Sequence, residues 1–228
     1  MNGTLQKKID KTRYYFDHTV RRLTPRALLR RRRRRLLADR DRFDEEALEE
    51  RVAYYHRLTQ PFELGPDAVS ARDIAIRKRK TYAFDLLEYF RMFPPERRLH
   101  CRFGDNLYNP QRPTIVKSRP IAPPHENAVL MNLNRVRHFI TVDDPLPFRE
   151  KRDLLVWRGA AYYPNRQWVV ERFCDHPLCD IGRTNPAPDG SAPPWIKPRM
   201  SIGEQLRCKF ILSIEGNDVA TNLKWIMS

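Results

Sequence analysis

The chain has 228 residues, of which 41% are hydrophobic and 11% aromatic, so it can bury a core and is not a disordered tail. Its formal net charge of +15 indicates an anionic partner: nucleic acid, an acidic membrane surface or a phosphate-bearing small molecule. The sequence has no run of about 18 apolar residues and no apolar signal core near its start, so we expect a cytoplasmic protein.

The four cysteines do not indicate a metal site. Cys174 and Cys179 flank His176 in the stretch CDHPLC, which places thiol and imidazole groups close together in the sequence. That spacing is not the spacing of a zinc finger, and no second pair of ligands follows it. We therefore expect reduced, partly buried thiols and no bound metal.

The first 60 residues are expected to be helical. Apolar and aromatic side chains recur at helical spacing over residues 9–23. Thr24 suits the N-cap of a second helix, with Pro25 at its first position. A third helix is expected over residues 44–58, where acidic residues come early and basic residues late, as the helix dipole prefers.

The run Arg30–Arg35 lies within the second of these helices. It could be a solvated helix face, a docking patch for anionic lipid head groups or a contact for nucleic acid. A helix with arginine on every side has no face to bury, so we expect this run to be exposed.

The middle of the chain mixes helix and strand signals. Residues 83–94 predict an amphipathic helix that two prolines end. A short strand over residues 99–107 breaks at a Gly-Asp pair, and prolines flank a second β-rich stretch at 113–121. Residues 126–141 predict a loop with a short strand or helix.

The last third alternates strands with helices, which predicts an α/β fold with a parallel sheet. In such sheets a ligand lies outside the carboxyl ends of the strands, so we expect residues 157–159, 180–182 and 215–222 at one rim. Ser201 and Glu204 have the spacing of a capping box. The expected strands are 152–160, 178–182 and 209–216, and the expected helices are 165–176, 201–208 and 221–228.

No Walker, GxGxxG, GxSxG or HExxH motif is present, so the candidate residues are polar groups at strand ends. Arg158 could bind a phosphate through its planar fork, while Gly159 would let a ligand approach the backbone. Alternatively, Arg158 forms a salt bridge at the end of its strand. Asp180, expected to end a short strand, could hold a ribose or base, or could cap a turn.

Asp105 follows an apolar strand, where its carboxylate could act as a general base for an acceptor hydroxyl, or could belong to a turn. Lys117 and Arg119 form a basic pair that could meet a phosphate or a charged acceptor. Three further residues open the last expected helix, whose N–H groups would favour an anion: Thr221, Asn222 and Lys224.

Four stretches together resemble glycosyltransferase family 90, and its bacterial lipopolysaccharide branch looks closest. They are FGDNLYNPQRPTIVKSRPI at 103–121, LMNLNRVRHFI at 130–140, VWRGA at 156–160 and CKFILSIEGNDVATNLKWIMS at 208–228. The resemblance extends over residues 70–228 and does not include the arginine-rich start.

The resemblance implies a GT-B-like arrangement of Rossmann-type domains that binds a nucleotide-sugar. The donor would be a UDP-sugar, and transfer would proceed with inversion, without an obligatory metal or other cofactor. Inversion needs one base for the acceptor hydroxyl, and cationic or N–H groups for the departing diphosphate.

The resemblance also assigns roles to residues of this chain. Asp105 resembles the catalytic aspartate, and Arg158 matches the arginine that faces the diphosphate. Asp180 resembles the acidic residue near the nucleoside. The stretch from Asp218 to Lys224 matches the donor-binding turn before a helix.

These implications divide the chain into three regions. Residues 1–65 form a basic helical region, 66–150 an acceptor-side α/β domain and 151–228 a nucleotide-sugar-binding domain. Members of the family continue beyond the last turn, so we expect the third domain to be incomplete, and the chain to be a truncated product or a fragment.

The leading hypothesis is a glycosyltransferase that extends a lipid-linked glycan such as the lipopolysaccharide core, at the inner membrane surface. The donor diphosphate and the anionic inner leaflet would explain the net charge. The competing hypotheses are a nucleic-acid-binding protein that uses the run Arg30–Arg35, and a non-catalytic remnant. A nucleic-acid reader should interleave its basic face with aromatic residues, and the sequence does not.

Overall fold

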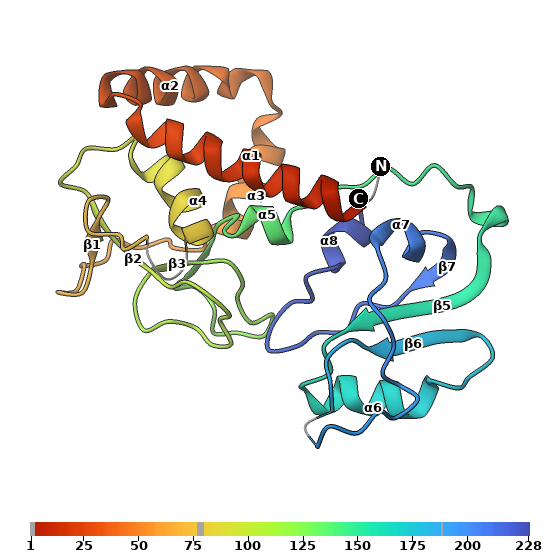
Figure 1. Ribbon diagram of the computed structural model, residues 1–228. Helices are drawn as coiled ribbons and strands as arrows, with labels where there is room; N and C mark the ends of the chain where they lie inside the picture. The colour runs from red at the N-terminus through yellow and green to blue at the C-terminus, as the bar shows by residue number, and fades with distance from the viewer. Residues whose placement is uncertain (1–2, 77–79, 188) are drawn as a thin grey trace. The chain divides into compact units, whose positions relative to one another are not determined.

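The computed structural model describes residues 3–76, 80–187 and 189–228 (Figure 1). The chain divides into two compact units, which are described separately. The N-terminal unit contains residues 11–139, and the C-terminal unit contains residues 140–228 together with the first ten residues. The domain limits expected at residues 65 and 150 stay predictions.

The helices of the N-terminal unit follow the expected order. Their bounds are α1 Gly3–Leu23, which begins in the first ten residues, α2 Arg26–Ala38, the 3-10 helix η1 Asp39–Arg42, α3 Glu45–Tyr55, α4 Lys80–Phe90 and α5 Arg135–His138. The strands are β1 Val69–Ser70, β2 Arg98–Cys101, β3 Thr114–Val116 and β4 Ala128–Leu130. Strands β2, β3 and β4 are parallel, and β1 pairs antiparallel with β2 at the edge.

The C-terminal unit contains a three-stranded sheet in the order β6-β5-β7, with all strands parallel. Its elements are the 3-10 helix η2 Phe148–Glu150, β5 Arg152–Gly159, α6 Pro164–Phe173, β6 Cys179–Arg183, α7 Ile202–Gln205, β7 Cys208–Ile211 and α8 Leu223–Ile226. The capping box of Ser201 and Glu204 begins α7 as predicted. The parallel strands of both units confirm the predicted α/β, Rossmann-like class.

Two details of α2 differ from the sequence-based expectation. Pro25 occupies the N-cap rather than the first helical position, so Thr24 lies one residue before the cap. The run Arg30–Arg35 is exposed as expected, yet the helix does bury one side, where Leu29 is 6% exposed. The arginine run gives no sign of this buried side, because Leu29 becomes buried only when α2 packs on the rest of the unit.

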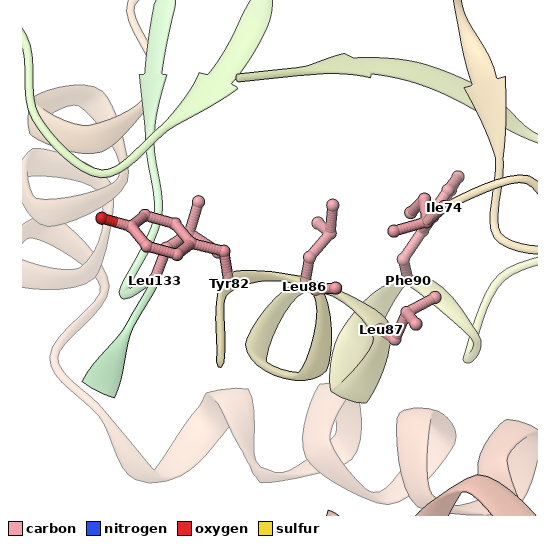
Figure 2. Packing of buried hydrophobic residues seen from close by; sticks show 7 residues of the cluster. Ile74, Tyr82, Leu86, Leu87, Phe90 and Leu133 are labelled. Carbon is pink, nitrogen blue, oxygen red and sulfur yellow. The ribbon is translucent and has the colours of Figure 1, made fainter. Parts of the chain in front are cut away.

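Helix α4 forms as expected and separates apolar from polar side chains, but it is buried around most of its circumference, so its polar side faces other helices rather than solvent. Its apolar side chains form the core of the unit (Figure 2), a cluster that consists of Ile74, Tyr82, Ala83, Leu86, Leu87, Phe90 and Leu133. The polar residues Asp85 and Glu88 are buried as well. The helix ends at Phe90, before the two prolines.

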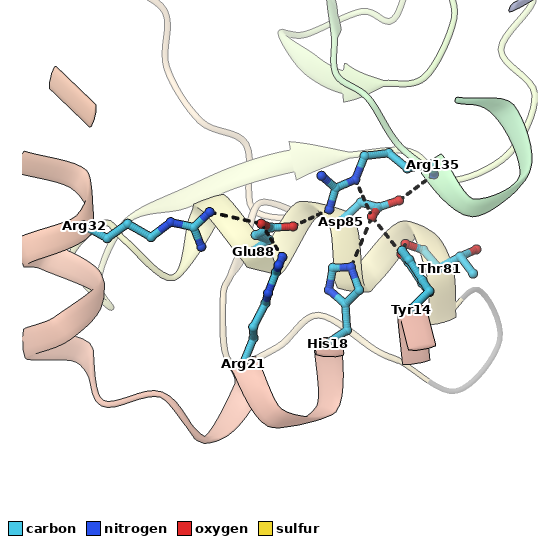
Figure 3. A network of polar contacts seen from close by, with 8 residues as sticks. All are labelled: Tyr14, His18, Arg21, Arg32, Thr81, Asp85, Glu88 and Arg135. Atoms are coloured by element: carbon cyan, nitrogen blue, oxygen red, sulfur yellow. Dashed lines mark hydrogen bonds and ion pairs between the residues drawn. The ribbon is translucent and has the colours of Figure 1, made fainter. Parts of the chain in front are cut away.

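Asp85 is fully buried and binds groups from two other helices (Figure 3). Its Oδ1 accepts hydrogen bonds from the Tyr14 hydroxyl of α1 at 2.7 Å and from Arg135 Nε of α5 at 2.9 Å. Its Oδ2 accepts one from the Arg135 backbone N–H at 2.8 Å. A buried carboxylate requires such partners, so Asp85 determines where α1 and α5 meet α4.

Glu88, one turn further along α4, forms ion pairs with three arginines (Figure 3). Its Oε1 accepts from Arg21 Nη1 of α1 at 2.6 Å and from Arg32 Nη2 of α2 at 3.3 Å, and Arg135 binds Oε2. Burial raises the pKa of Glu88, but the charges of Arg135 and Arg21 outweigh it and hold this pKa below its ordinary value. The carboxylate thus stays ionised and ties α2 to the core.

Replacing Asp85 by Asn should lower the free energy of unfolding by about 3 kcal/mol, because the Arg135 guanidinium loses one of its two buried counter-charges and the Tyr14 hydroxyl loses a charged acceptor. Urea denaturation followed by circular dichroism measures this loss. Glu49→Gln is the control, since Glu49 forms an exposed ion pair with Arg40 and should change stability by less than about 1 kcal/mol. Equal losses in the two variants would contradict the structural role of Asp85.

His18 should make the stability depend on pH. Burial lowers its pKa below the ordinary value of 6.5 and outweighs the opposing charges of Asp85 and Glu88. The unfolded chain therefore takes up a proton that the folded chain resists, so stability is full above pH 6.5 and falls as the pH drops toward the folded pKa. Urea midpoints measured across this window should decline for the unaltered chain. They should decline less for His18→Gln, and an unchanged slope would contradict the assignment.

Candidate functional site

The carboxyl edge of the β6-β5-β7 sheet gathers the loops that the sequence predicts at one rim. Gly159, the last residue of β5, lies in register with Arg183, the last residue of β6. Strand β7 runs parallel to β5 and ends at Ile211, four residues before the expected stretch 215–222. The stretches around 157–159 and after β7 therefore leave the sheet at the same edge.

Arg158 and Asp180 lie together on one face of this sheet. Arg158 Nη2 donates to Asp180 Oδ1 at 2.7 Å, and Lys197 Nζ lies 3.2 Å from the same oxygen. Burial raises the pKa of Asp180, but the hydrogen bond and charge of Arg158 outweigh it and keep this pKa below its ordinary value. Asp180 is the second residue of β6 rather than its last, so the expectation that it ends the strand is wrong.

The side chain of Arg158 is 8% exposed and has further backbone partners. Its Nε donates to the carbonyl of Pro198 at 3.1 Å, and its Nη1 donates to the carbonyls of Trp157 and Asp180 at 3.0 and 2.6 Å. These bonds support the salt-bridge alternative for Arg158. Its contact with a donor diphosphate, and that of Asp180 with a nucleoside, stay predictions.

Gly159 is required by its neighbour Trp157. A Cβ atom at position 159 would lie 2.6 Å from the indole ring, which is 3% exposed and packs in the core of the unit. The absence of a side chain thus has a packing reason in addition to the ligand approach that the sequence suggests.

Arg166 is a cation of this edge that the sequence analysis did not single out. Its guanidinium donates to the carbonyls of Ala160, Ile214 and Glu215, at 3.0, 2.7 and 3.1 Å, and so joins the loops that follow β5 and β7. Burial lowers the pKa of Arg166. Since these partners are neutral, its positive charge is not cancelled at the edge where a ligand would bind. In the sequence, the one feature that points to Arg166 as a ligand-binding residue is its position in the first turn of a helix that follows a strand.

The stretch after β7 is held by Asn222. Its Nδ2 donates to the carbonyl of Leu212 at 3.0 Å, and its Oδ1 accepts from the Ser213 hydroxyl at 3.1 Å. Asn222 occupies the N-cap of α8 without a side-chain cap bond. Asp218, Thr221 and Lys224 are half-buried in the same segment, and the donor contacts expected of these residues stay predictions.

Asp105 belongs to the N-terminal unit, in a turn after β2. Gly104 has a φ of 108°, a left-handed conformation that favours glycine, and this turn leads the chain to Asp105. Lys117, directly after β3, places Nζ 3.1 Å from Asp105 Oδ1, and its side chain is 4% exposed while that of Asp105 is 42% exposed. The structure thus joins the predicted base to a buried lysine that was expected to meet a phosphate or an acceptor.

The two residues of the expected basic pair, Lys117 and Arg119, have different partners, and Asn106 stabilises the turn. Arg119 donates to the backbone carbonyl of Tyr54, and its guanidinium lies 5.1 Å from the centre of that ring. Burial lowers the pKa of Arg119. Asn106, 2% exposed, donates from Nδ2 to the carbonyls of Tyr108 and Ser118, at 2.8 and 3.3 Å. A phosphate or acceptor contact of Lys117 and Arg119 stays a prediction.

The chain is 43% identical over 224 residues to a protein of Dichelobacter nodosus named O-glucosyltransferase LpsA. The alignment includes 96% of this chain and 69% of that protein. The chain belongs to this family of glycosyltransferases. No family model and no solved structure matches it. The relative confirms the prediction of a glycosyltransferase enzyme, and the assignment to family 90 in particular stays a prediction.

The glycosyltransferase has four free cysteines, as expected. Over residues 3–76, 80–187 and 189–228, the structure shows no group of three or more His, Cys, Asp or Glu residues that could hold a metal ion. Within those same ranges, no helix has both the length and the apolar character needed to cross a membrane.

Gly159→Ala should lower the free energy of unfolding by about 1–3 kcal/mol with no ligand present, because the added methyl group overlaps the Trp157 ring. Thermal denaturation measures this loss. Gly203→Ala is the matched control in the same unit, since no atom lies within 4 Å of its built Cβ and it belongs to helix α7, where Ala is preferred. A glycine needed only for ligand approach would leave Gly159→Ala as stable as this control.

Proposed function

We propose that the chain transfers glucose from a UDP-sugar donor to a hydroxyl group of a glycan acceptor such as the lipopolysaccharide core. The observation that carries this proposal is the identity of 43% to a protein named O-glucosyltransferase over 96% of the chain. The family 90 resemblance of residues 70–228 supports the UDP donor and the lipopolysaccharide acceptor. The parallel sheet of the C-terminal unit is of the kind whose carboxyl edge binds nucleotides.

In the proposed reaction, the acceptor oxygen attacks the anomeric carbon of the donor sugar and forms the new glycosidic bond with inversion. The bond between that carbon and the diphosphate oxygen breaks, and the diphosphate leaves with the electron pair. Asp105 receives the proton of the acceptor hydroxyl. By the family resemblance, cationic side chains rather than a metal stabilise the leaving group.

Arg166 is suited to the leaving diphosphate because the described partners of its guanidinium, carbonyl oxygens in the loops after β5 and β7 and two aromatic rings, carry no negative charge. The stretch from Asp218 to Lys224 follows the same edge and would contribute its polar side chains and N–H groups to the donor. Arg158 would act from beside this edge, with its orientation maintained by Asp180.

Lys117 would act as a positioning residue for the base. Its buried ammonium group holds the Asp105 carboxylate through the 3.1 Å ion pair, and the partly exposed carboxylate can still receive a proton from a hydroxyl outside the turn. The turn residues Gly104 and Asn106 set the backbone on either side of Asp105.

Asp105→Asn should reduce kcat by roughly 10²–10⁴-fold, the usual contribution of a general base. Transfer of radiolabelled glucose from UDP-glucose to an acceptor oligosaccharide of the lipopolysaccharide core measures this. UDP affinity should change little, because Asp105 is assigned to the acceptor hydroxyl and not to the donor. The unfolding midpoint should fall, because the buried Lys117 ammonium group loses this ion pair, so kcat is compared on folded protein checked by circular dichroism.

Asp67→Asn is the control for this assay, since Asp67 is another exposed carboxylate of the N-terminal unit that pairs with a basic side chain, Arg112. It should keep normal turnover. Normal turnover of Asp105→Asn would overturn the base assignment. No transfer by the unaltered chain from any UDP-hexose would overturn the proposed function.

A further inference from the structure

Helix α2 presents an arginine face to the solvent. Leu29 is buried, Arg32 reaches Glu88 and Arg33 lies 4.7 Å from the centre of the Phe93 ring, so this side of the helix is occupied by the unit itself. The other side carries exposed arginines, which we call the arginine face: Arg30, Arg31, Arg34 and Arg35. The structure shows no carboxylate paired with these four among the described residues.

Helix α1 exposes an apolar stripe. Phe16, Val20 and Leu23 recur at helical spacing and are 68%, 49% and 81% exposed. They lie on the side of α1 opposite Tyr14 and His18, which contact Asp85 of α4. Three large apolar side chains in a row on one exposed helix face mark an interaction surface.

Both helices attach to the same carboxylate, which brings the two surfaces together. Arg21 of α1 and Arg32 of α2 donate to the same oxygen of Glu88 (Figure 3). The apolar stripe and the arginine face are each on the outer side of a helix whose inner side binds α4. We call these two exposed faces together the α1–α2 surface, which combines positive charge with apolar side chains.

The interior between these helices is also rich in positive charge. A cavity of about 210 Å³ lies between α1, α2 and α4. Its charged lining consists of Arg21, Arg22, Arg32, Arg91 and Glu88, together with His18. Burial lowers the pKa of Arg91, and the nearby charges of Arg26 and Arg22 add to this effect, so positive charge is in excess here.

We propose that the α1–α2 surface docks the enzyme on a bilayer that contains anionic phospholipids. The arginine face contacts lipid phosphates, and Phe16, Val20 and Leu23 enter the head-group region. Arginine beside exposed apolar side chains is the composition of helices that lie in a membrane interface. Docking of this kind uses only the two N-terminal helices, so it is independent of the proposed glucosyl transfer.

A nucleic acid would contact the arginine face but not the apolar stripe, so it would use the α1–α2 surface less completely than a bilayer would. The phosphates of a duplex would pair with the arginines, but the apolar stripe would stay exposed beside a highly charged polymer. A bilayer uses both surfaces at once, and the observations therefore favour it.

The experiment is co-sedimentation of the full chain with phosphatidylcholine vesicles that contain or lack phosphatidylglycerol. At about 0.1 M salt the chain should bind only the anionic vesicles, and about 1 M salt should weaken the binding strongly. The combined substitution Arg30→Gln, Arg31→Gln, Arg34→Gln and Arg35→Gln should lower the partition coefficient by roughly two orders of magnitude or more. Circular dichroism should be unchanged, because these side chains are exposed.

The matched control removes the same number of charges from exposed arginines elsewhere: Arg97→Gln, Arg149→Gln, Arg172→Gln and Arg199→Gln. This variant should keep most of the vesicle binding. Phe16→Gln with Leu23→Gln should weaken the binding without changing net charge, which separates insertion from simple charge attraction.

Three outcomes would overturn the proposal. The unaltered chain could fail to bind anionic vesicles. The control variant could lose as much binding as the α2 variant, which would show a general charge effect. Duplex DNA could bind at about 0.15 M salt through the arginine face while vesicles do not, which would make the surface a nucleic-acid contact. None of these results would affect the transfer assay, so the two proposals can fail separately.

Discussion

Two buried carboxylates on one helix organise the arginine-rich half of this protein. A charge removed from water must be paired, and Asp85 and Glu88 find their partners on α1, α2 and α5. This requirement selects which arginines turn inward. Arg32 is drawn to Glu88, and its neighbours in the run Arg30–Arg35 are left facing the solvent. The exposed positive surface is therefore a consequence of the buried pairing.

The C-terminal unit uses arginine in two contrasting ways. Arg158 is neutralised by Asp180 and stabilises the interior of one sheet face. Arg166 donates to three backbone carbonyls and lies near the Trp157 and Tyr163 rings, so it joins two loops and keeps its charge at the carboxyl edge. In the proposed reaction, Arg166 would bring this charge to the leaving diphosphate, and Arg158 would act from beside the edge.

The family assignment and the geometry support different parts of the functional argument. Similarity to an O-glucosyltransferase identifies the chain as a glycosyltransferase. The geometry shows a partly exposed carboxylate, Asp105, joined to Lys117, and a cation, Arg166, at a parallel sheet edge. Their roles in proton transfer and in binding the diphosphate belong to the proposal. Glycine is favoured at positions 104 and 159 for different reasons. Gly104 has a left-handed backbone conformation, and Gly159 lies against the Trp157 ring. The sequence predicted a break at Gly104, but it did not show that the Trp157 ring lies against Gly159.

Sequence reasoning was sufficient for the elements that depend on near neighbours: the helices of the first 60 residues, the parallel strands of the last third and the capping box at Ser201. It also identified Asp105 and Arg158 as polar residues near strand ends. Their partners became known only from the folded chain, as did the pairing of Tyr14 with Asp85, which are 71 positions apart. For the same reason the burial of Asp85 and Glu88 on α4 was not foreseen and Arg166 was missed. Periodicity and caps act over a few residues, whereas burial and pairing depend on segments that meet only when the chain has folded.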